Sequence, residues 1–314
     1  MIQQHILHNK LGLSVTILNY GGIIQAIKTK TGTNLVLGFN KTADYIQHNY
    51  QHFGAIIGRL ANRVANAKFK INNHVYNLER NEKNKQCLHS GSTGLQFVYW
   101  DLKFLHEDNA VQLKYHSPDG EGGFPGNVDF LVTYQLTETN QLIMTYRATT
   151  DQVTPIDLTN HTYWNLSANE TILHARAKFY ADQYLPTDID NIPLGNSLSI
   201  KNTPLDFIDT KSIGQDIMQL PETHGYDHYY ILNHTNTKMQ LATEIIDSHY
   251  HLKVFTDQPG FQFYSGNFLR IPYAGFCIET QNYPNAINQV NFPSPLITPE
   301  KAYSQQTIFQ LELM

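Results

Sequence analysis

NVDFLVTYQLTETNQLIMTYRA, residues 127–148, is the stretch of sequence that decides the fold. Apolar and aromatic side chains stand at every second position, from Val128 to Leu136 and again from Leu142 to Ala148, with mostly polar residues between them. Alternation with a period of two is typical of a strand that buries one face. The polar run TETNQ separates the two halves, so the stretch predicts two long antiparallel strands joined by a turn.

The same alternation recurs along the chain, at 68–78, 173–179 and 252–263. The dipeptide Asn72-Asn73 interrupts the first of these segments and predicts a two-residue hairpin turn, because Asn tolerates positive φ. Helical periodicity is scarce, and the best candidate is a short helix around 210–220. The strands also follow one another without the helices that a parallel sheet needs between them. We therefore expect an all-β fold, a large antiparallel β-sandwich, in one domain that spans residues 1–314.

The composition is that of a globular protein with a sizeable core, with 41% hydrophobic and 16% charged residues. The net charge of −5 and the lack of a basic run argue against nucleic acid as a partner. Neither a secretory signal nor an apolar run long enough to span a membrane is visible, so we expect a cytoplasmic protein. The two cysteines, Cys87 and Cys277, are too few for a disulfide framework and are interpreted as packing residues.

Polar segments interrupt the strands, and loops on a rigid scaffold commonly carry binding and catalytic residues. GRLANRVANAKF (58–69) contains Arg59, Asn62 and Arg63, which form either a solvated turn or a set of donors for hydroxyl and carboxylate oxygens. LHSGSTGL (88–95) places His89 in a Gly/Ser-rich loop, where a histidine is more often structural than functional. Each segment taken alone has an ordinary structural interpretation.

The segment TPIDLTNHTYWNLS (154–167) gathers His161, Tyr163 and Trp164 within four positions. The ordinary interpretation is a strand end with a satisfied histidine and two core aromatics. In FCIETQNYPNAIN (276–288), Glu279 follows a hydrophobic triplet and stands either at a strand edge or in a pocket that raises its pKa. GYDH (225–228) and QPGFQFYSGNF (258–268) add an acid, amides and aromatics. Aromatic rings stack on sugar faces and polar groups bind hydroxyls, so the set together suggests a carbohydrate site.

The chain resembles the aldose 1-epimerases, also called galactose mutarotases. The resemblance implies a galactose mutarotase-like β-supersandwich and an enzyme that interconverts the α and β anomers of free aldoses, such as D-galactose and D-glucose. Such a reaction only moves protons and implies neither cofactor nor metal. The matching stretches follow the family order over nearly the whole chain: NYGG (19–22), GRLANRVANAKF, LHSG, DGEGGFPGN (119–127), LTNHTYWNLS, LPTD (185–188), TPLDF (203–207), GYDHYYIL, QPGFQFYSGNF and FCIETQNYPNAINQ.

The resemblance also implies roles for individual residues. Glu279 matches the general base that acts on the C1 hydroxyl, His161 the general acid at the ring oxygen, and His89 an assisting catalytic histidine. Ser90 and Asn285 depart from the common family pattern and bear on substrate preference rather than on the reaction. The implied sugar-binding residues are Asn62, Arg63, Asp227 and Gln262.

Other interpretations stay open at this point. The chain could be a sugar-binding or regulatory protein without catalysis, or a glycoside hydrolase or lyase that uses Asp227 and Glu279. It could be a metal enzyme that uses His89, His161 and Glu279, although these residues lack the close spacing common in metal sites. A relative that acts on hexose 6-phosphates would need additional Arg or Lys for the phosphate. The sequence leaves open a monomer or a homodimer, and whether Tyr163 or Trp164 lines the site.

Overall fold

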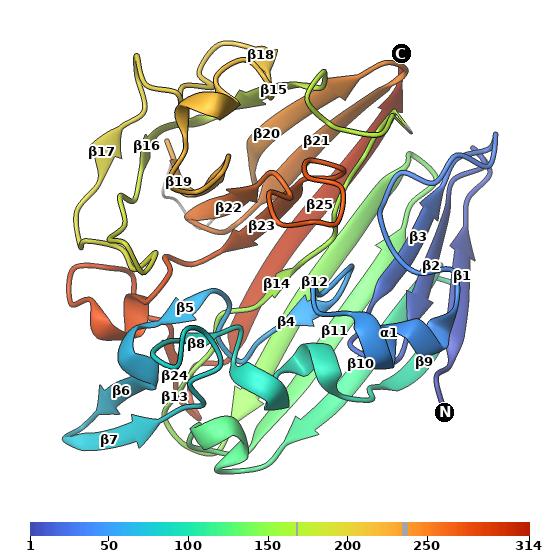
Figure 1. Ribbon diagram of the computed structural model, residues 1–314. Helices are drawn as coiled ribbons and strands as arrows, with labels where there is room; N and C mark the ends of the chain where they lie inside the picture. The colour runs from blue at the N-terminus through green and yellow to red at the C-terminus, as the bar shows by residue number, and fades with distance from the viewer. Residues whose placement is uncertain (168, 234–237) are drawn as a thin grey trace.

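The largest element of the computed structural model is a nine-stranded antiparallel sheet, which runs diagonally through the molecule (Figure 1). The structure describes residues 1–167, 169–233 and 238–314. The strand order is β18-β15-β20-β21-β25-β12-β11-β10-β9. The bounds are β18 Lys211–Ser212, β15 Arg176–Phe179, β20 Gln240–Asp247, β21 Tyr250–Thr256, β25 Tyr303–Leu313, β12 Gln141–Thr150, β11 Val128–Leu136, β10 Ala110–Ser117 and β9 Asp101–Leu105.

The hairpin predicted from residues 127–148 is confirmed by β11 and β12, which pair in register from Val128 opposite Thr150 to Leu136 opposite Leu142. Every second side chain of β11 is buried, as the alternation requires. The second predicted hairpin is also present, as β6 (Lys68–Ile71) and β7 (His74–Asn77). Its turn residues, Asn72 and Asn73, have φ values of 46° and 69°. Positive φ at both positions is the signature of a type I′ turn, which matches the twist of the two strands.

Two smaller sheets pack on the large one and complete the predicted β-sandwich. A five-stranded sheet has the order β17-β16-β19-β22-β23, and a three-stranded sheet has the order β1-β2-β3. Phe179 of the large sheet shows how the layers meet, because its ring lies 5.2 Å from Phe261 and 5.0 Å from Phe263 of the five-stranded sheet. The bounds are β17 Leu198–Ser199, β16 Ala181–Tyr184, β19 Asp227–Leu232, β22 Gly260–Tyr264, β23 Cys277–Gln281, β1 Gln4–His8, β2 Ser14–Leu18 and β3 Ile24–Lys28.

Short strand pairs connect the layers and carry the segments that matter for function. β14 (Thr159–Asn160) pairs with β4 (Ile56–Ile57), and β5 (Arg63–Val64) pairs with β8 (Cys87–Leu88). β13 (Thr154–Pro155) pairs with β24 (Leu296–Ile297). Beyond β14, Trp164 bridges to Phe276, just before β23. This bridge draws the segment that contains His161 alongside β23 at the edge of the five-stranded sheet.

The helix predicted around 210–220 is wrong. That stretch contains β18 and only a single 3-10 turn, Ile217–Gln219. Two separated apolar residues, Ile213 and Ile217, are buried there, which is too little apolar surface to hold an amphipathic helix. The α-helix that does occur in the described residues, α1 (Thr42–His48), buries only Tyr45 and has no periodic apolar face to reveal it in the sequence. None of the described helices combines the length and the apolar character needed to cross a membrane.

Candidate active site

A cavity of about 420 Å³ opens on the face of the five-stranded sheet that points away from the large sheet. The alternation of β22 explains why, since Phe261 and Phe263 enter the core while Gln262 and Tyr264 line the cavity. Asn62 and Arg63 at the start of β5, His89 after β8 and His161 after β14 contribute to the walls. All seven residues that the sequence nominated line this cavity: Asn62, Arg63, His89, His161, Asp227, Gln262 and Glu279.

Glu279 and His161 lie next to each other and are almost fully buried. Glu279 Oε1 is 3.8 Å from His161 Nε2, too far for a direct hydrogen bond. The second carboxyl oxygen, Oε2, has no hydrogen-bond partner among the described residues. On the other side of the imidazole, His161 Nδ1 lies 3.4 Å from the Sγ atom of Cys277, which shares the cavity-facing side of β23 with Glu279. The pair is therefore held in place but keeps one face free.

Burial determines the protonation of this pair. It raises the pKa of Glu279 well above its ordinary value; the carboxylate of Asp227 raises it further and Arg63 opposes the shift. Burial also lowers the pKa of His161 to about 3, with a smaller contribution from His52. Burial therefore favours the neutral form of both side chains, a protonated Glu279 and an uncharged His161.

His89 is fixed as a neutral hydrogen-bond donor. Its Nδ1 accepts the backbone N–H of Asn62 at 3.1 Å, so the ring proton is on Nε2. The backbone N–H of His89 in turn donates to the Asn62 carbonyl at 3.0 Å. Burial, followed by the neighbouring His161, His52 and Arg63, lowers the pKa of His89 well below its ordinary value. His89 is therefore suited to donate an N–H rather than to release a proton.

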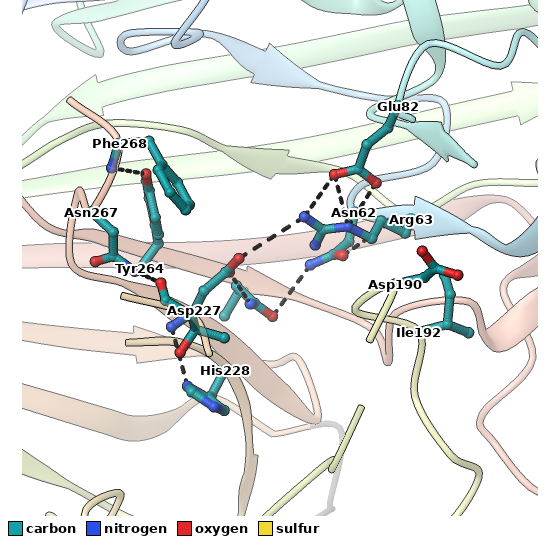
Figure 2. A network of polar contacts seen from close by, with 12 residues as sticks. Asn62, Arg63, Glu82, Asp190, Ile192, Asp227, His228, Tyr264, Asn267 and Phe268 are labelled. Atoms are coloured by element: carbon teal, nitrogen blue, oxygen red, sulfur yellow. Dashed lines mark hydrogen bonds and ion pairs between the residues drawn. The ribbon is translucent and has the colours of Figure 1, made fainter. Parts of the chain in front are cut away.

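A chain of polar contacts beside Glu279 forms another part of the cavity wall (Figure 2). Asn62 Nδ2 donates to Gln262 Oε1 at 3.2 Å, and Gln262 Nε2 donates to Asp227 Oδ1 at 2.6 Å. Arg63 contacts Glu82 through two N–H groups, each at 2.9 Å, and lies 4.0 Å from Asp227 Oδ2. Burial alone would lower the pKa of Arg63, but Asp227 and Glu82 outweigh it and raise the pKa. The result is a fixed array of donors and acceptors of the kind that binds vicinal hydroxyls.

The structure shows which of the residues that the sequence left undecided line the cavity. Tyr163 lines the cavity, whereas Trp164 packs on Phe309 in the main core with ring centroids 5.0 Å apart. Arg59 points elsewhere and binds Ser117 Oγ and the carbonyl of Pro125. The two departures from the family pattern, Ser90 and Asn285, do not line the cavity and instead hydrogen-bond the backbone at Leu60 and Ala65.

Sequence reasoning missed several residues of the cavity. His52 and Tyr264 line it, and Glu82 positions Arg63. Cys277 was interpreted as a packing residue; it is buried, but it also contacts the His161 ring. Its place two residues before Glu279 on a strand was the available signal, because such residues share one face. No local pattern marks His52, which reaches the cavity only through the tertiary fold.

A metal ion must be considered, because one ligand atom from each of His89, His161 and Glu279 lies within 4.8 Å of the others. The wide sequence spacing of these residues therefore does not argue against a metal centre. Charge does not exclude one either, because Arg63 is paired with Glu82 and the carboxylate of Asp227 also acts on Glu279.

Comparisons with known proteins identify the family. The family described as Aldose 1-epimerase matches residues 3–310. The chain is 37% identical to the galactose mutarotase of Homo sapiens, over 96% of this chain and 92% of that protein. It is 32% identical to the aldose 1-epimerase of Escherichia coli K12, over 97% and 93% of the two chains. The chain belongs to the aldose 1-epimerase family.

Solved structures agree with this assignment. An aldose epimerase homologue from C. elegans superposes with a TM-score of 0.92 at 25% identity and covers 100% of both chains. A galactose 1-epimerase from Lactobacillus acidophilus superposes with a TM-score of 0.89 at 27% identity, over 99% of this chain and 95% of that one. The predicted resemblance and the predicted fold are both confirmed. As a member of the aldose 1-epimerase family, the chain is an isomerase that acts on carbohydrates.

Proposed function

We propose that this aldose 1-epimerase interconverts the α and β anomers of free aldoses such as D-galactose and D-glucose. The observation that carries the proposal is the Glu279–His161 pair, with Oε1 and Nε2 3.8 Å apart at the wall of the cavity. In a pyranose, the C1 hydroxyl and the ring oxygen O5 are bonded to the same carbon. Two groups at this separation can face those two oxygens at the same time.

Ring opening needs one proton removed from the C1 hydroxyl and one proton added to O5. In the proposed reaction the carboxylate of Glu279 takes the first proton and the imidazolium of His161 supplies the second, while the Nε2–H of His89 donates a hydrogen bond to the ring oxygen. Rotation about C1–C2 then presents the other face of the aldehyde. Reclosure reverses both proton transfers and yields the other anomer.

The protonation of the free protein fits this cycle. After ring opening the pair is a neutral acid and a neutral imidazole, which is the state that burial favours in the empty cavity. The opening step uses the ionic state, which contains the same single proton. Sugar hydroxyls that donate to the carboxylate stabilise the ionic state once substrate is bound, and Arg63 acts in the same direction. The total charge of the site is then constant through the turnover.

Asn62, Arg63, Asp227 and Gln262 are the proposed sugar-binding residues, since their polar atoms already form one network on the cavity wall. A phosphorylated sugar is a poorer fit. The cations that line the cavity, Arg63 and Lys83, are each paired with an acid, Glu82 and Asp190 respectively. A free monosaccharide needs no unpaired cation.

The direct test follows the optical rotation of freshly dissolved α-D-galactose, with and without the protein. We expect a faster approach to the equilibrium rotation, and no release of chromophore from an aryl galactoside. The absence of acceleration by folded protein with galactose, glucose, xylose and arabinose alike would refute the proposed activity. Sugar binding without acceleration would instead support the non-catalytic, sugar-binding alternative.

We also propose a single domain over 1–314, a cytoplasmic location, and a monomeric or homodimeric state. Core residues from Leu7 to Leu311 belong to one hydrophobic cluster, which supports the single domain. Limited proteolysis tests it, since a single domain resists cleavage into two stable halves. Light scattering distinguishes the two assembly states.

A further inference from the structure

His52 is a third histidine of the cavity, and the proposed reaction does not use it. Its ring centroid lies 5.5 Å from that of His89 and 6.0 Å from that of His161, which are themselves 5.5 Å apart. The ring of Phe97 packs edge-on against His52 at 5.6 Å. Three imidazoles thus form a compact triangle, and neighbouring rings fix the orientation of His52.

The backbone of His52 is held in a conformation that needs support. Its φ is +56°, in the left-handed region that residues other than glycine adopt at a cost, often at functional sites. The buried Asn49 holds this turn: its carbonyl accepts the N–H of His52 at 3.1 Å and its Oδ1 accepts the N–H of Phe53 at 2.7 Å.

The turn is also tied to the neighbouring histidine. Gly54 donates its N–H to the His161 carbonyl at 3.0 Å, and His161 donates its N–H to the Ala55 carbonyl at 2.9 Å. These two hydrogen bonds join the turn directly to the residue that is proposed to protonate O5. His52 is therefore placed at a fixed position relative to His161.

The protonation of the His52 ring follows from its surroundings. Nδ1 is buried and has no hydrogen-bond partner among the described residues. A buried N–H without an acceptor is rare, so Nδ1 is the bare nitrogen and the proton is on Nε2. Nε2 is not among the buried unpaired atoms, so it is the nitrogen that remains accessible from the cavity. Burial lowers the pKa of His52 to about 4, and the ring offers one N–H as a neutral donor at pH 7.

The order of groups along the cavity indicates which part of a sugar this N–H meets. Gln262 and its polar network lie directly across the strand pair from Glu279. His52 contacts His161 but is not part of the compact set that His161 forms with His89 and Glu279. In a pyranose with its C1 hydroxyl at Glu279 and O5 at His161, C2 and C3 extend toward the polar network. C5 and the C6 hydroxymethyl group then extend past O5, on the side of His161, whose ring lies against His52.

We propose that His52 donates its Nε2–H to the C6 hydroxyl of a hexose and thereby makes this enzyme favour hexoses over the corresponding pentoses. The inference rests on the proposed function, because the orientation of the sugar comes from it. His52 would then be a specificity-determining residue, distinct from the acid–base pair and from the network that binds the C2 and C3 hydroxyls.

Two sugars that differ only at C6 provide the test. L-arabinose has the ring hydroxyl configuration of D-galactose but lacks C6. His52→Phe removes the nitrogen and keeps a flat ring against Phe97. For this variant we expect kcat/KM for D-galactose to fall about 3- to 10-fold, the effect of one neutral hydrogen bond, and kcat/KM for L-arabinose to change less than about 2-fold. D-glucose and D-xylose form a second pair with the same expectation.

His52→Gln is the matched variant, because its amide N–H reaches about as far as Nε2, and it should retain the preference for D-galactose. An equal loss with both sugars, or no loss with D-galactose, would overturn the inference. If His52→Phe does not fold, His52→Met takes its place as the variant without an N–H. Dissociation constants for both sugars, measured by calorimetry in parallel, show whether His52 sets the preference for D-galactose over L-arabinose even if the wild type lacks turnover. A wild type without turnover would refute the proposed reaction. The loss or retention of the preference for binding D-galactose in the His52 variants would still test the role of His52.

Discussion

At the scale of single residues, the site depends on how burial distributes one proton between two side chains. Burial favours the neutral forms of both Glu279 and His161, so its effects on their pKa values have opposite signs. The pair therefore holds a single proton over a pH range much wider than two exposed side chains would allow. Because the two groups interact, the pH dependence of catalysis belongs to the pair rather than to either residue.

The pH profile of kcat/KM should accordingly have a broader plateau than two exposed side chains would give. The rate falls in acid only as the pH approaches the lowered pKa of His161, about 3, where the pair gains a second proton and loses its base. It falls in alkali only above the raised pKa of Glu279, where the pair loses its acid. Initial rates from polarimetry, corrected for the uncatalysed reaction, measure this. A bell limited by pKa values of about 4.3 and about 6.5, the ordinary values of Glu and His, would contradict the account.

Glu82 acts through Arg63, and this too can be tested at the residue scale. Glu82→Gln removes the charge that holds the guanidinium, so Arg63 turns toward Asp227 and away from its sugar-binding orientation. We expect kcat/KM for D-galactose to fall by roughly 3- to 30-fold, mainly through KM. Glu312→Gln is the control, since Glu312 pairs with Lys253 at 2.8 Å on the large sheet, outside the cavity lining. Equal kinetics for the two variants would argue against a positioning role for Glu82.

At the scale of elements, the alternation of side chains along strands explains why β11 and β12 were predicted from the sequence. It also explains why the cavity residues His52 and Glu82 were missed. The period of two at 127–148 was sufficient to predict β11 and β12 and their buried faces. The same period places Glu279 beside Cys277 on one face of β23, opposite Gln262 on β22. Periodicity states which residues share a face but not which distant segment faces them. The approach of His52 and Glu82 to the cavity depends on such long-range packing, and no local pattern reports it.

The turn at 49–55 shows how one element supports another. Gly54 has φ +68°, and a Cβ there would lie 2.1 Å from the carbonyl oxygen of Ile24. Gly54→Ala should therefore destabilise the fold by about 1–3 kcal/mol or more and lower activity, because the His161 backbone is bonded to the same turn. Denaturant unfolding and polarimetry measure the two effects.

Gly32→Ala is the matched control for this prediction. Gly32 also has a left-handed φ, +86°, but a Cβ there would meet nothing within 4 Å. Its replacement should cost only the backbone strain, about 1 kcal/mol, and should leave activity unchanged. If both variants lose the same stability and both keep full activity, the turn does not support His161.

At the scale of the whole molecule, the sandwich supplies a rigid wall rather than an interior site. The inner face of the five-stranded sheet packs in the core through Phe261 and Phe263. The outer face of the same sheet carries Gln262 and Glu279, which line the cavity. The fold class was predictable because alternation extends along most of the chain. The pairing of β14 with β4, which precedes His161 in the chain, was not predictable, since it covers only two residues of each strand.

Chelation tests the whole molecule for a metal requirement. The proposed reaction only moves protons, so the cluster of His89, His161 and Glu279 is expected to act without a divalent cation. Prolonged dialysis against a strong chelator should change neither the mutarotation rate nor the Tm. A loss of activity that added Zn²⁺ restores would contradict this prediction and support the alternative of a metal enzyme.

The most direct measurement of the central claim compares wild type and Glu279→Gln in the mutarotation of α-D-galactose, with Glu312→Gln as the control. The substitution keeps the size and polarity of the side chain and removes its capacity to ionise and to accept a proton. We predict a loss of about 10²–10⁴-fold in the enzymatic rate, with galactose affinity by calorimetry retained within a few-fold. A Glu279→Gln variant that binds galactose and turns it over at the rate of the wild type would contradict the proposed role of Glu279 and the proton relay built on it.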